Sequence, residues 1–412
     1  MIPWLLTRPQ ATYLNALGTR LRRVLNRVLR AYAEDPVIQT VLPLSDDERS
    51  WMSQLAPKGI PEPATVFERL DTNLDVDDPH WPKTLRFLEF NSVGVGCVDF
   101  TPVANELIAE HVLPTAQPIF GSATCRMTVD PRALLHQMFQ AHAKAIGRTQ
   151  CVVALVERRE TPVGGADEMS HVSEWLKAQG MHSLVADPRE LEVRNGELVY
   201  KDVTIDLVYR DFALSEIISI EKHGGQVEAM KHAFRHNQVI SAITGEFDHK
   251  SVCEFLASPE FERYFTPSQR RTFQAFMPWT RLVRERKTTD ADRHEIDLSD
   301  YLRTHREGLV LKPNRAYGGQ DVVIGVDVTA AVWDQAIWRA LAESNQWVVQ
   351  EFVPLPKAEF LDLRNGKSTT QEFVTVGFIA TPGGIAFVGR ASRERVVNIS
   401  RGGSLVPMFL MT

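Results

Sequence analysis

The sequence predicts a mixed fold, α+β and α/β, in which antiparallel sheets with packed helices are joined to a small α/β layer. Three observations predict it. Residues 10–34 carry apolar side chains at helical spacing, residues 150–210 alternate between strand-like and helix-like segments, and several strand-like apolar runs follow residue 308. Alternation of strand and helix is typical of an α/β layer, whereas successive strands favour antiparallel pairing.

The first predicted element is an amphipathic helix over residues 10–34. Its apolar face includes Leu14, Leu17 and Leu21, and its opposite face is rich in arginine. Such a helix can lie on a membrane surface, but packing on the body of the protein with a solvated polar face is the commoner case.

The remaining elements follow from hydrophobic periodicity and turn residues. Asn195-Gly196 predicts a hairpin turn, and residues 213–305 are expected to be mostly helical. Strands after residue 308 are expected to form an antiparallel sheet crossed by one helix. We expect loops at 59–63 and 75–82, helices at 131–146, 170–179 and 330–342, and strands at 84–89, 151–156, 182–185, 198–200, 205–209, 309–312, 322–326, 347–351, 372–380 and 385–389.

Length and composition exclude several classes of protein. A chain of 412 residues suits two or three hydrophobic cores, and a net charge of −6 argues against a nucleic-acid partner. No apolar run approaches the roughly 18 residues of a membrane helix, and Met1–Pro9 lacks the features of a signal peptide. The four cysteines are far apart and form no CxxC pair, so we expect a reduced, cytoplasmic protein without a membrane partner.

A lysine followed by a glycine loop indicates a phosphate-binding site. Lys312 ends an apolar run, and Gly318 and Gly319 lack the Cβ atoms that would keep phosphate oxygens away from their amides. No GxxxxGK[ST] loop is present. A plain hairpin turn between two strands explains Tyr317-Gly318-Gly319 equally well on spacing alone.

Glu89 and Asn91 flank one residue of an extended segment, so their side chains point to the same face. A carboxylate and an amide oxygen are the hard donors that magnesium prefers. Taken alone, however, the pair is better explained as polar residues that cap a turn at a strand end.

Two further segments carry residue types suited to a nucleotide. Gln350-Glu351-Phe352-Val353 ends a strand and offers backbone groups to an adenine edge, with Glu351 as an acceptor for a ribose hydroxyl. Arg393 and Arg395, expected on one face of a strand and followed by Gly402-Gly403, can bind a polyanion. An ordinary strand end and a solvated basic edge strand are the respective alternatives.

Taken in order, these segments resemble the circularly permuted branch of the ATP-grasp ligases, which is related to eukaryotic glutathione synthetase and glutathionylspermidine synthetase. In ordinary ATP-grasp enzymes the magnesium-binding Glu-x-Asn follows the nucleotide lysines, whereas here it precedes them, as in the permuted branch. The matching segments run from about residue 65 to 407 and are Arg69-Leu70-Asp71, Glu89-Phe90-Asn91, Asp248-His249-Lys250, Lys312 with its glycine loop, Gln350–Val353, Glu372, and Arg393 and Arg395 before Gly402-Gly403.

The resemblance implies a function and a role for each matching residue. The implied enzyme joins a carboxylate to an amine through an acyl-phosphate and releases ADP and phosphate, with ATP and magnesium as cofactors. It implies magnesium at Glu89 and Asn91, catalytic roles for Arg69, Arg393 and Arg395, and nucleotide contacts from Lys250, Lys312, Tyr317, Gly318, Gly319, Gln350, Glu351, Phe352, Val353, Glu372, Gly402 and Gly403. Where the branch usually has a further magnesium-binding carboxylate, this chain reads Arg315-Ala316-Tyr317, so the third ligand is Asp71 or a water.

The resemblance also divides the chain. Residues 1–120 would hold an N-terminal helical segment and the magnesium-site strands, 121–235 a small α/β substrate domain, 236–305 a helical nucleotide-lysine region, and 306–412 an antiparallel region with the glycine flap. The substrates would be a small carboxylate and an amine, such as an amino acid, peptide or polyamine, and the assembly a homodimer. Loops near 157–168 and 355–369 would shape the substrate pocket. The rival functions are a nucleotide-binding protein without catalysis and a phosphotransferase acting on a small carboxylate.

Overall fold

The computed structural model describes residues 3–55, 62–115, 124–148, 151–159, 168–361 and 369–412. Part of the expected loop at 59–63, and much of the substrate loops expected near 157–168 and 355–369, lie outside the described residues.

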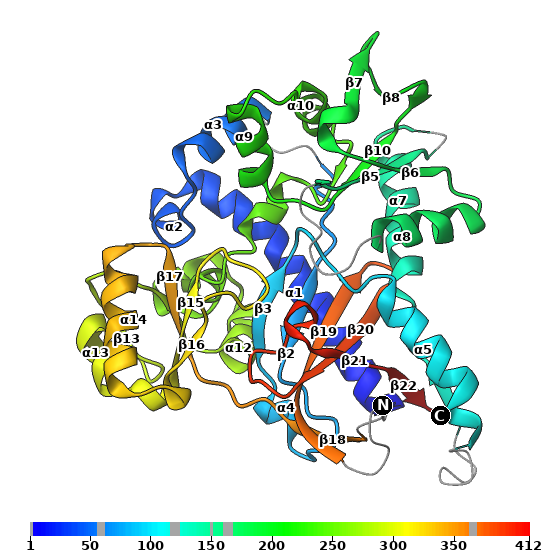
Figure 1. The fold of residues 1–412 in the computed structure, drawn as a ribbon. Helices are drawn as coiled ribbons and strands as arrows, with labels where there is room; N and C mark the ends of the chain where they lie inside the picture. Colours follow the sequence, from blue (N-terminus) through cyan, green and yellow to red (C-terminus); the bar gives the residue numbers. More distant parts are fainter. Residues whose placement is uncertain (1–2, 56–61, 116–123, 149–150, 160–167, 362–368) are drawn as a thin grey trace.

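The largest sheet is antiparallel and packs against the N-terminal helix. Helix α1 (Arg8–Glu34) begins with a capping box between Thr7 and Gln10 and lies across β19 and β20 (Figure 1). Leu14, Leu17 and Leu21 are buried in the core between helix and sheet, which confirms the packed amphipathic helix. The strands of this sheet, in order, are β21 (Ser404–Val406), β20 (Gly384–Ser392), β19 (Thr369–Thr381), β2 (Arg69–Thr72) and β3 (Phe87–Asn91), and β18 (Lys357–Leu361) also pairs with β19.

A second antiparallel sheet has the order β12 (Thr280–Leu282), β17 (Trp347–Glu351), β15 (Leu309–Pro313) and β16 (Val323–Ile324). Helices α13 (Leu298–Thr304) and α14 (Ala330–Ala342) pack together beside it and share its apolar core. The five strands expected after residue 308 therefore divide between two sheets instead of forming one, and Met408–Met411 pairs in a third sheet with Trp4–Thr7 and Cys125–Met127. The division occurs at residues 352–356, which carry the chain from β17 to β18 without pairing.

The structure contains the small α/β layer that the alternating pattern predicted, and its sheet is parallel. Its order is β11 (Val239–Ile240), β10 (Leu207–Arg210), β5 (Val153–Val156) and β6 (Ser183–Ala186). Asn195 and Gly196 join β7 (Leu191–Arg194) to β8 (Glu197–Tyr200) with positive φ angles of 53° and 80°, which confirms the hairpin turn. The other elements of this layer are β9 (Val203–Thr204), α7 (Pro131–Ala145), α8 (Glu168–Ala178), α9 (Leu214–Lys222) and α10 (Glu228–Arg235).

Smaller elements complete the chain. Residues 213–305 include short strands that the helical expectation missed: besides β11 and β12, β13 (Lys287–Thr289) pairs with β14 (Glu295–Asp297). Among the described residues, no helix combines the length and the apolar character needed to cross a membrane. The other elements are β1 (Trp4–Thr7), β4 (Cys125–Met127), β22 (Met408–Met411), α2 (Pro36–Val41), α3 (Asp46–Leu55), α4 (Trp81–Thr84), α5 (Phe100–His111), α11 (Val252–Ala257) and α12 (Pro267–Phe276).

Candidate functional site

A cavity of about 160 Å³ lies between the two antiparallel sheets. Strands β2, β3, β19 and β20 supply one wall, and β15, β16 and β17 supply the other. Figure 1 shows β15 and β16 facing β3 across this region. The loop after β15 and the loop after β20 also line the cavity, so segments far apart in sequence meet there.

The first wall carries four polar side chains on one face of two paired strands. Asp71 lies opposite Glu89, and Arg69 lies opposite Asn91, in the register of β2 and β3. Because side chains alternate along a strand, all four point to the same face, and all four line the cavity. The amide nitrogen of Asn91 donates to Asp71 Oδ2 at 3.1 Å, so the amide oxygen is the atom left to meet a ligand.

Asp71 is held between two arginines. Arg69 Nε donates to its Oδ1 at 2.9 Å, and Arg390 Nη2 lies 2.8 Å from its Oδ2. Burial opposes ionisation, but the two guanidinium groups together hold the pKa of Asp71 at about 2. Gly377 of β19 lies opposite Asp71, and a Cβ there would be 2.6 Å from Arg69 Cδ and 2.7 Å from Asp71 Oδ1. The absence of a side chain at Gly377 gives the ion pair its space.

The second wall presents Lys312 with a neutral partner. Its Nζ donates to Gln350 Oε1 at 2.6 Å, and Gln350 Nε2 in turn donates to Thr280 Oγ1 at 3.0 Å. Burial lowers the pKa of Lys312 to about 8, with the nearby charge of Lys250 adding to that effect and Glu89 opposing it. An anion in the cavity would stabilise the charged form of Lys312 and raise this pKa again.

Lys250 joins the two walls. It lies two residues before α11, and its Nζ is 3.1 Å from Glu89 Oε1 and donates to the carbonyl oxygen of Ala316 at 2.6 Å. Lys250 therefore connects the carboxylate on β3 to the loop that follows β15.

The loop with the glycine pair meets the loop after β20. Gly318 and Gly319 both have φ of 71°, which side chains rarely adopt, and a Cβ on Gly319 would be 2.2 Å from Val396 Cγ1. Arg401 Nη1 donates to the carbonyl oxygen of Gly319 at 3.1 Å. The backbone conformation therefore favours glycine at both positions, and the contact between the loops additionally requires it at Gly319.

An apolar part of the lining borders these charges. The segment after β17 contributes Phe352, Val353 and Leu355, and β19 contributes Phe373. Glu351 also lines the cavity, and the guanidinium of Arg395 lies 4.9 Å from the ring centroid of Phe373. This combination of flat apolar surface and cationic groups suits a ligand with an aromatic part and a polyanionic part.

Five predicted residues are not part of the cavity lining. Glu372 precedes Phe373 in β19, so its side chain lies on the face of the strand opposite Phe373 and Thr375. Tyr317 is 42% exposed, and its hydroxyl contacts Asp248 Oδ1 at 3.4 Å. Gly402 and Gly403 lie in the turn beyond the lining segment 395–398.

The fifth, Arg393, lies just beyond the end of β20. Strand β20 stops at Ser392, so Arg393 and Arg395 lie in a loop and the expectation that they share a strand face is wrong. Arg395 lines the cavity, whereas the side chain of Arg393 is 57% exposed and lies 3.9 Å from Glu372.

The lining also includes polar residues that sequence reasoning did not identify as site residues, among them Arg390 and Thr375. Arg390 and Thr375 are neighbours on one face of the β19–β20 ladder. Arg390 belongs to the same basic segment as Arg393, but strand alternation assigns residue 390 to the face opposite residues 393 and 395, so that pattern could not identify it.

On the opposite side of β2, one residue before the strand begins, Glu68 is buried and borders a different cavity that Arg22 also lines. Its Oε1 has no hydrogen-bond partner among the described residues. Burial raises the pKa of Glu68 to about 8, against the opposing effect of Arg22.

The comparisons with known proteins begin with sequence. No protein-family model matches the chain. A protein of Frankia casuarinae whose name marks it as a candidate glutamate–cysteine ligase is 26% identical over 260 residues. That match covers 60% of this chain and 27% of the relative, so the chain spans about a quarter of the length of the relative.

Solved structures give a match over nearly the whole chain. The apo form of a glutathione synthetase-like effector from Globodera pallida has a TM-score of 0.59 at 12% identity, covering 98% of this chain and 83% of that one. A candidate γ-glutamylcysteine synthetase from Methylobacillus flagellatus has a TM-score of 0.47 at 12% identity, with coverages of 99% and 90%. On the first of these matches, the arrangement of antiparallel sheets and packed helices is a mixed α/β fold similar to that of the glutathione synthetase-like effector.

Proposed function

We propose that this protein is an ATP- and magnesium-dependent ligase of the circularly permuted ATP-grasp type, which joins a small carboxylate to an amine. One observation carries the proposal. Lys250, Lys312 and the Glu89–Asn91 pair, from three separate parts of the chain, line one cavity between two antiparallel sheets. The similarity of the fold to a glutathione synthetase-like effector and the partial similarity to a candidate glutamate–cysteine ligase support the same class of reaction.

The residues in the first wall fit a divalent cation. Glu89 and Asn91 project from alternate positions of β3, and the contact between Asn91 nitrogen and Asp71 leaves an amide oxygen beside the Glu89 carboxylate. Such oxygen donors suit magnesium, which would neutralise phosphate charge when bound. Asp71 is less suited to be the third ligand, because both of its oxygens already accept from arginine.

The protein groups have separable tasks in the proposed reaction. Lys312 and Lys250 would bind phosphate oxygens, and the meeting loops at Gly319 and Val396 would exclude water from the acyl-phosphate. The carboxylate oxygen of the substrate attacks the γ-phosphorus, and ADP leaves. The amine then attacks the acyl carbon, an amide bond forms, and phosphate leaves with the loss of one amine proton.

The test is phosphate release by the purified chain with ATP, magnesium, and a panel of amino acids, peptides and polyamines, followed by mass analysis of the products. The proposal expects release that needs both a carboxylate and an amine, with a product lighter than the summed substrates by one water. ADP release that needs only the carboxylate, with a phosphorylated product in place of free phosphate, would identify a phosphotransferase.

One observation favours the rival without catalysis. Arg315 stands where the resemblance led us to look for a metal-binding carboxylate, and it pairs with Glu48 instead of lining the cavity. A nucleotide-binding protein without turnover would bind ATP with magnesium, gain thermal stability from it, and release no phosphate with any substrate pair.

A further inference from the structure

The loop that carries the glycine pair, residues 314–320, is fixed on its inner side by the segment around Lys250. The backbone nitrogen of Lys250 donates to the Asn314 carbonyl at 3.0 Å, and that of Ser251 donates to Asn314 Oδ1 at 2.9 Å. Together with the contact from Lys250 Nζ to Ala316, these bonds set where the loop leaves β15. They do not reach the outer side of the loop.

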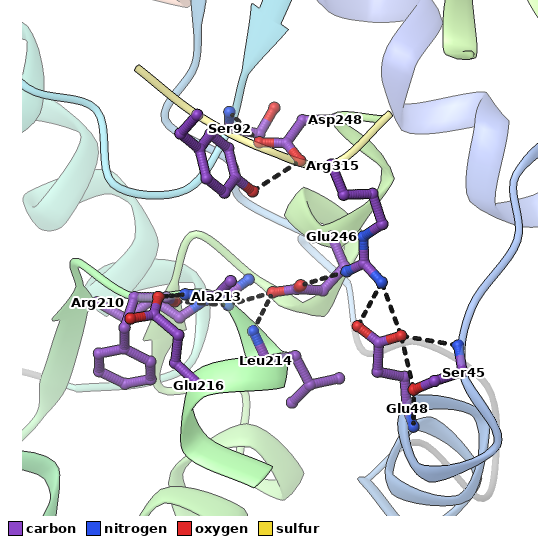
Figure 2. A network of polar contacts seen from close by, with 12 residues as sticks. Ser45, Glu48, Ser92, Arg210, Ala213, Leu214, Glu216, Glu246, Asp248 and Arg315 are labelled. Atoms are coloured by element: carbon purple, nitrogen blue, oxygen red, sulfur yellow. Dashed lines mark hydrogen bonds and ion pairs between the residues drawn. The ribbon is translucent and has the colours of Figure 1, made fainter. Parts of the chain in front are cut away.

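On the outer side, Arg315 is held by two buried carboxylates from different parts of the chain. Its Nη1 lies 2.6 Å from Glu48 Oε1 and 2.7 Å from Oε2, and its Nη2 lies 3.6 Å from Glu246 Oε2. Glu48 and Glu246 are only 1% and 2% exposed. Figure 2 shows the Arg315 guanidinium between these two carboxylates.

Both carboxylates are themselves fixed. Glu48 lies in the first turn of α3 and accepts from the Ser45 nitrogen at 2.8 Å, as in a capping box. Glu246 pairs with the buried Arg210 of β10 and accepts from the Leu214 nitrogen at 3.1 Å. Figure 2 shows this continuous chain of contacts from α3 through Arg315 to the α/β layer.

We propose that Glu48 and Glu246 are positioning residues that hold the 314–320 loop over the cavity, so that helix α3 forms part of the nucleotide site without touching the nucleotide. The physical reason is the cost of an unpaired buried charge. If Arg315 moved away with the loop, the nearly inaccessible Glu48 would lose its cation, while Glu246 would keep only Arg210, so the closed loop is favoured before any ligand arrives.

This inference rests on the proposed nucleotide site and assigns a role to a segment that the resemblance left without one. It also assigns different roles to Glu48 and to Asp47, its neighbour on the same helix. Asp47 pairs with Lys222 at 2.5 Å, and both side chains are at least half exposed, so this pair contributes little to stability and does not reach the loop.

The experiment measures the affinity of the full chain for ATP with magnesium by calorimetry. Glu48→Gln keeps the shape and the capping contact but removes the charge, and we expect the dissociation constant to rise about tenfold. Asp47→Asn is the matched control, with an expected change below about twofold. Phosphate release at saturating nucleotide should change less than the affinity does, because Glu48 contacts no reacting atom.

A double-mutant cycle with Arg315→Gln tests the contact itself. Arg315 is partly exposed, so this variant is expected to fold even if Glu48→Gln does not. If Glu48 acts through Arg315, the double variant binds about as weakly as either single variant, whereas independent effects would multiply. Melting curves without nucleotide identify any loss of fold.

The outcomes are distinct. If the parent binds ATP with magnesium but folded Glu48→Gln and Arg315→Gln variants bind it equally tightly, the positioning role is wrong and the nucleotide site stands. If the parent does not bind the nucleotide at all, the proposed function and this inference both fall.

Discussion

The two walls of the cavity differ in how their charges are balanced. On the wall formed by β2, β3 and β20, Asp71 is paired with Arg69 and Arg390. On the wall formed by β15 and β17, Lys312 donates to the neutral amide of Gln350, and burial lowers its pKa to about 8. Within the first wall, the charge of Asp71 is thus neutralised by arginines of the same sheet. On the second wall, the charge of Lys312 would be neutralised by an incoming anion.

The largest effect is expected when one charged side chain is removed from either wall. Lys312→Ala and Glu89→Ala are each expected to lower ATP turnover by about 100-fold or more, because Lys312 would bind phosphate oxygens and Glu89 would hold the magnesium that neutralises them. Phosphate release and a melting curve are measured for each variant. Lys287→Ala, which breaks an exposed pair with Glu295, is the control and should match the parent. Parent-like turnover in both site variants would contradict the assignment of the site.

A smaller change disturbs only the balanced wall. Gly377→Ala places a methyl group within 2.7 Å of Asp71 Oδ1 and against the stem of Arg69, so the pair must shift. We expect a loss of about 1–3 kcal/mol in the free energy of unfolding and about tenfold in turnover. Denaturant titration and phosphate release measure the two effects. Gly308→Ala is the control, since no atom lies within 4 Å of its added Cβ. Equal behaviour of the two alanine variants would show that the pair tolerates displacement.

The smallest predicted effect is the pH dependence of nucleotide affinity. The pKa of Lys312 is lowered to about 8, so the neutral fraction of Lys312 in the free protein grows as pH rises. Binding of an anion then requires Lys312 to take up a proton. Affinity should therefore fall about fourfold between pH 7 and pH 8.5. Calorimetry of the parent and of Lys312→Arg, which stays charged, measures this difference. A parent profile as flat as that of the arginine variant would mean that Lys312 does not meet the nucleotide.

Local pattern predicted the elements that set the first wall. The alternation in Glu89-Phe90-Asn91 placed two oxygen donors on one face, and the structure has them there. The pattern could not give the partner of Asp71, because Arg390 reaches it only through the register of β19 with β2 and β20. The need for glycine at residue 377 could not be predicted for the same reason, because the side chains that occupy the space beside it come from another strand.

Sequence reasoning was less successful for the strands and loops at the edges of the second wall. The short strands β12 to β14 fell in a region whose periodicity indicated helices, and β12 exists because it pairs with β17, about seventy residues later. The loop arginines were misplaced because a strand pattern was extended past Ser392, where the chain turns towards the cavity. The contact between Glu48 and Arg315 spans 267 residues and leaves no local signal.

Glu68 gives the fold a pH response of its own, unrelated to any ligand. Its pKa rises from 4.5 to about 8 on burial, so the folded chain retains a proton that the unfolded chain releases. The stability that Glu68 contributes is complete below about pH 4.5 and declines as pH rises through 8. The contribution of Glu68 to the free energy of unfolding is therefore larger in mildly acidic buffer than in alkaline buffer.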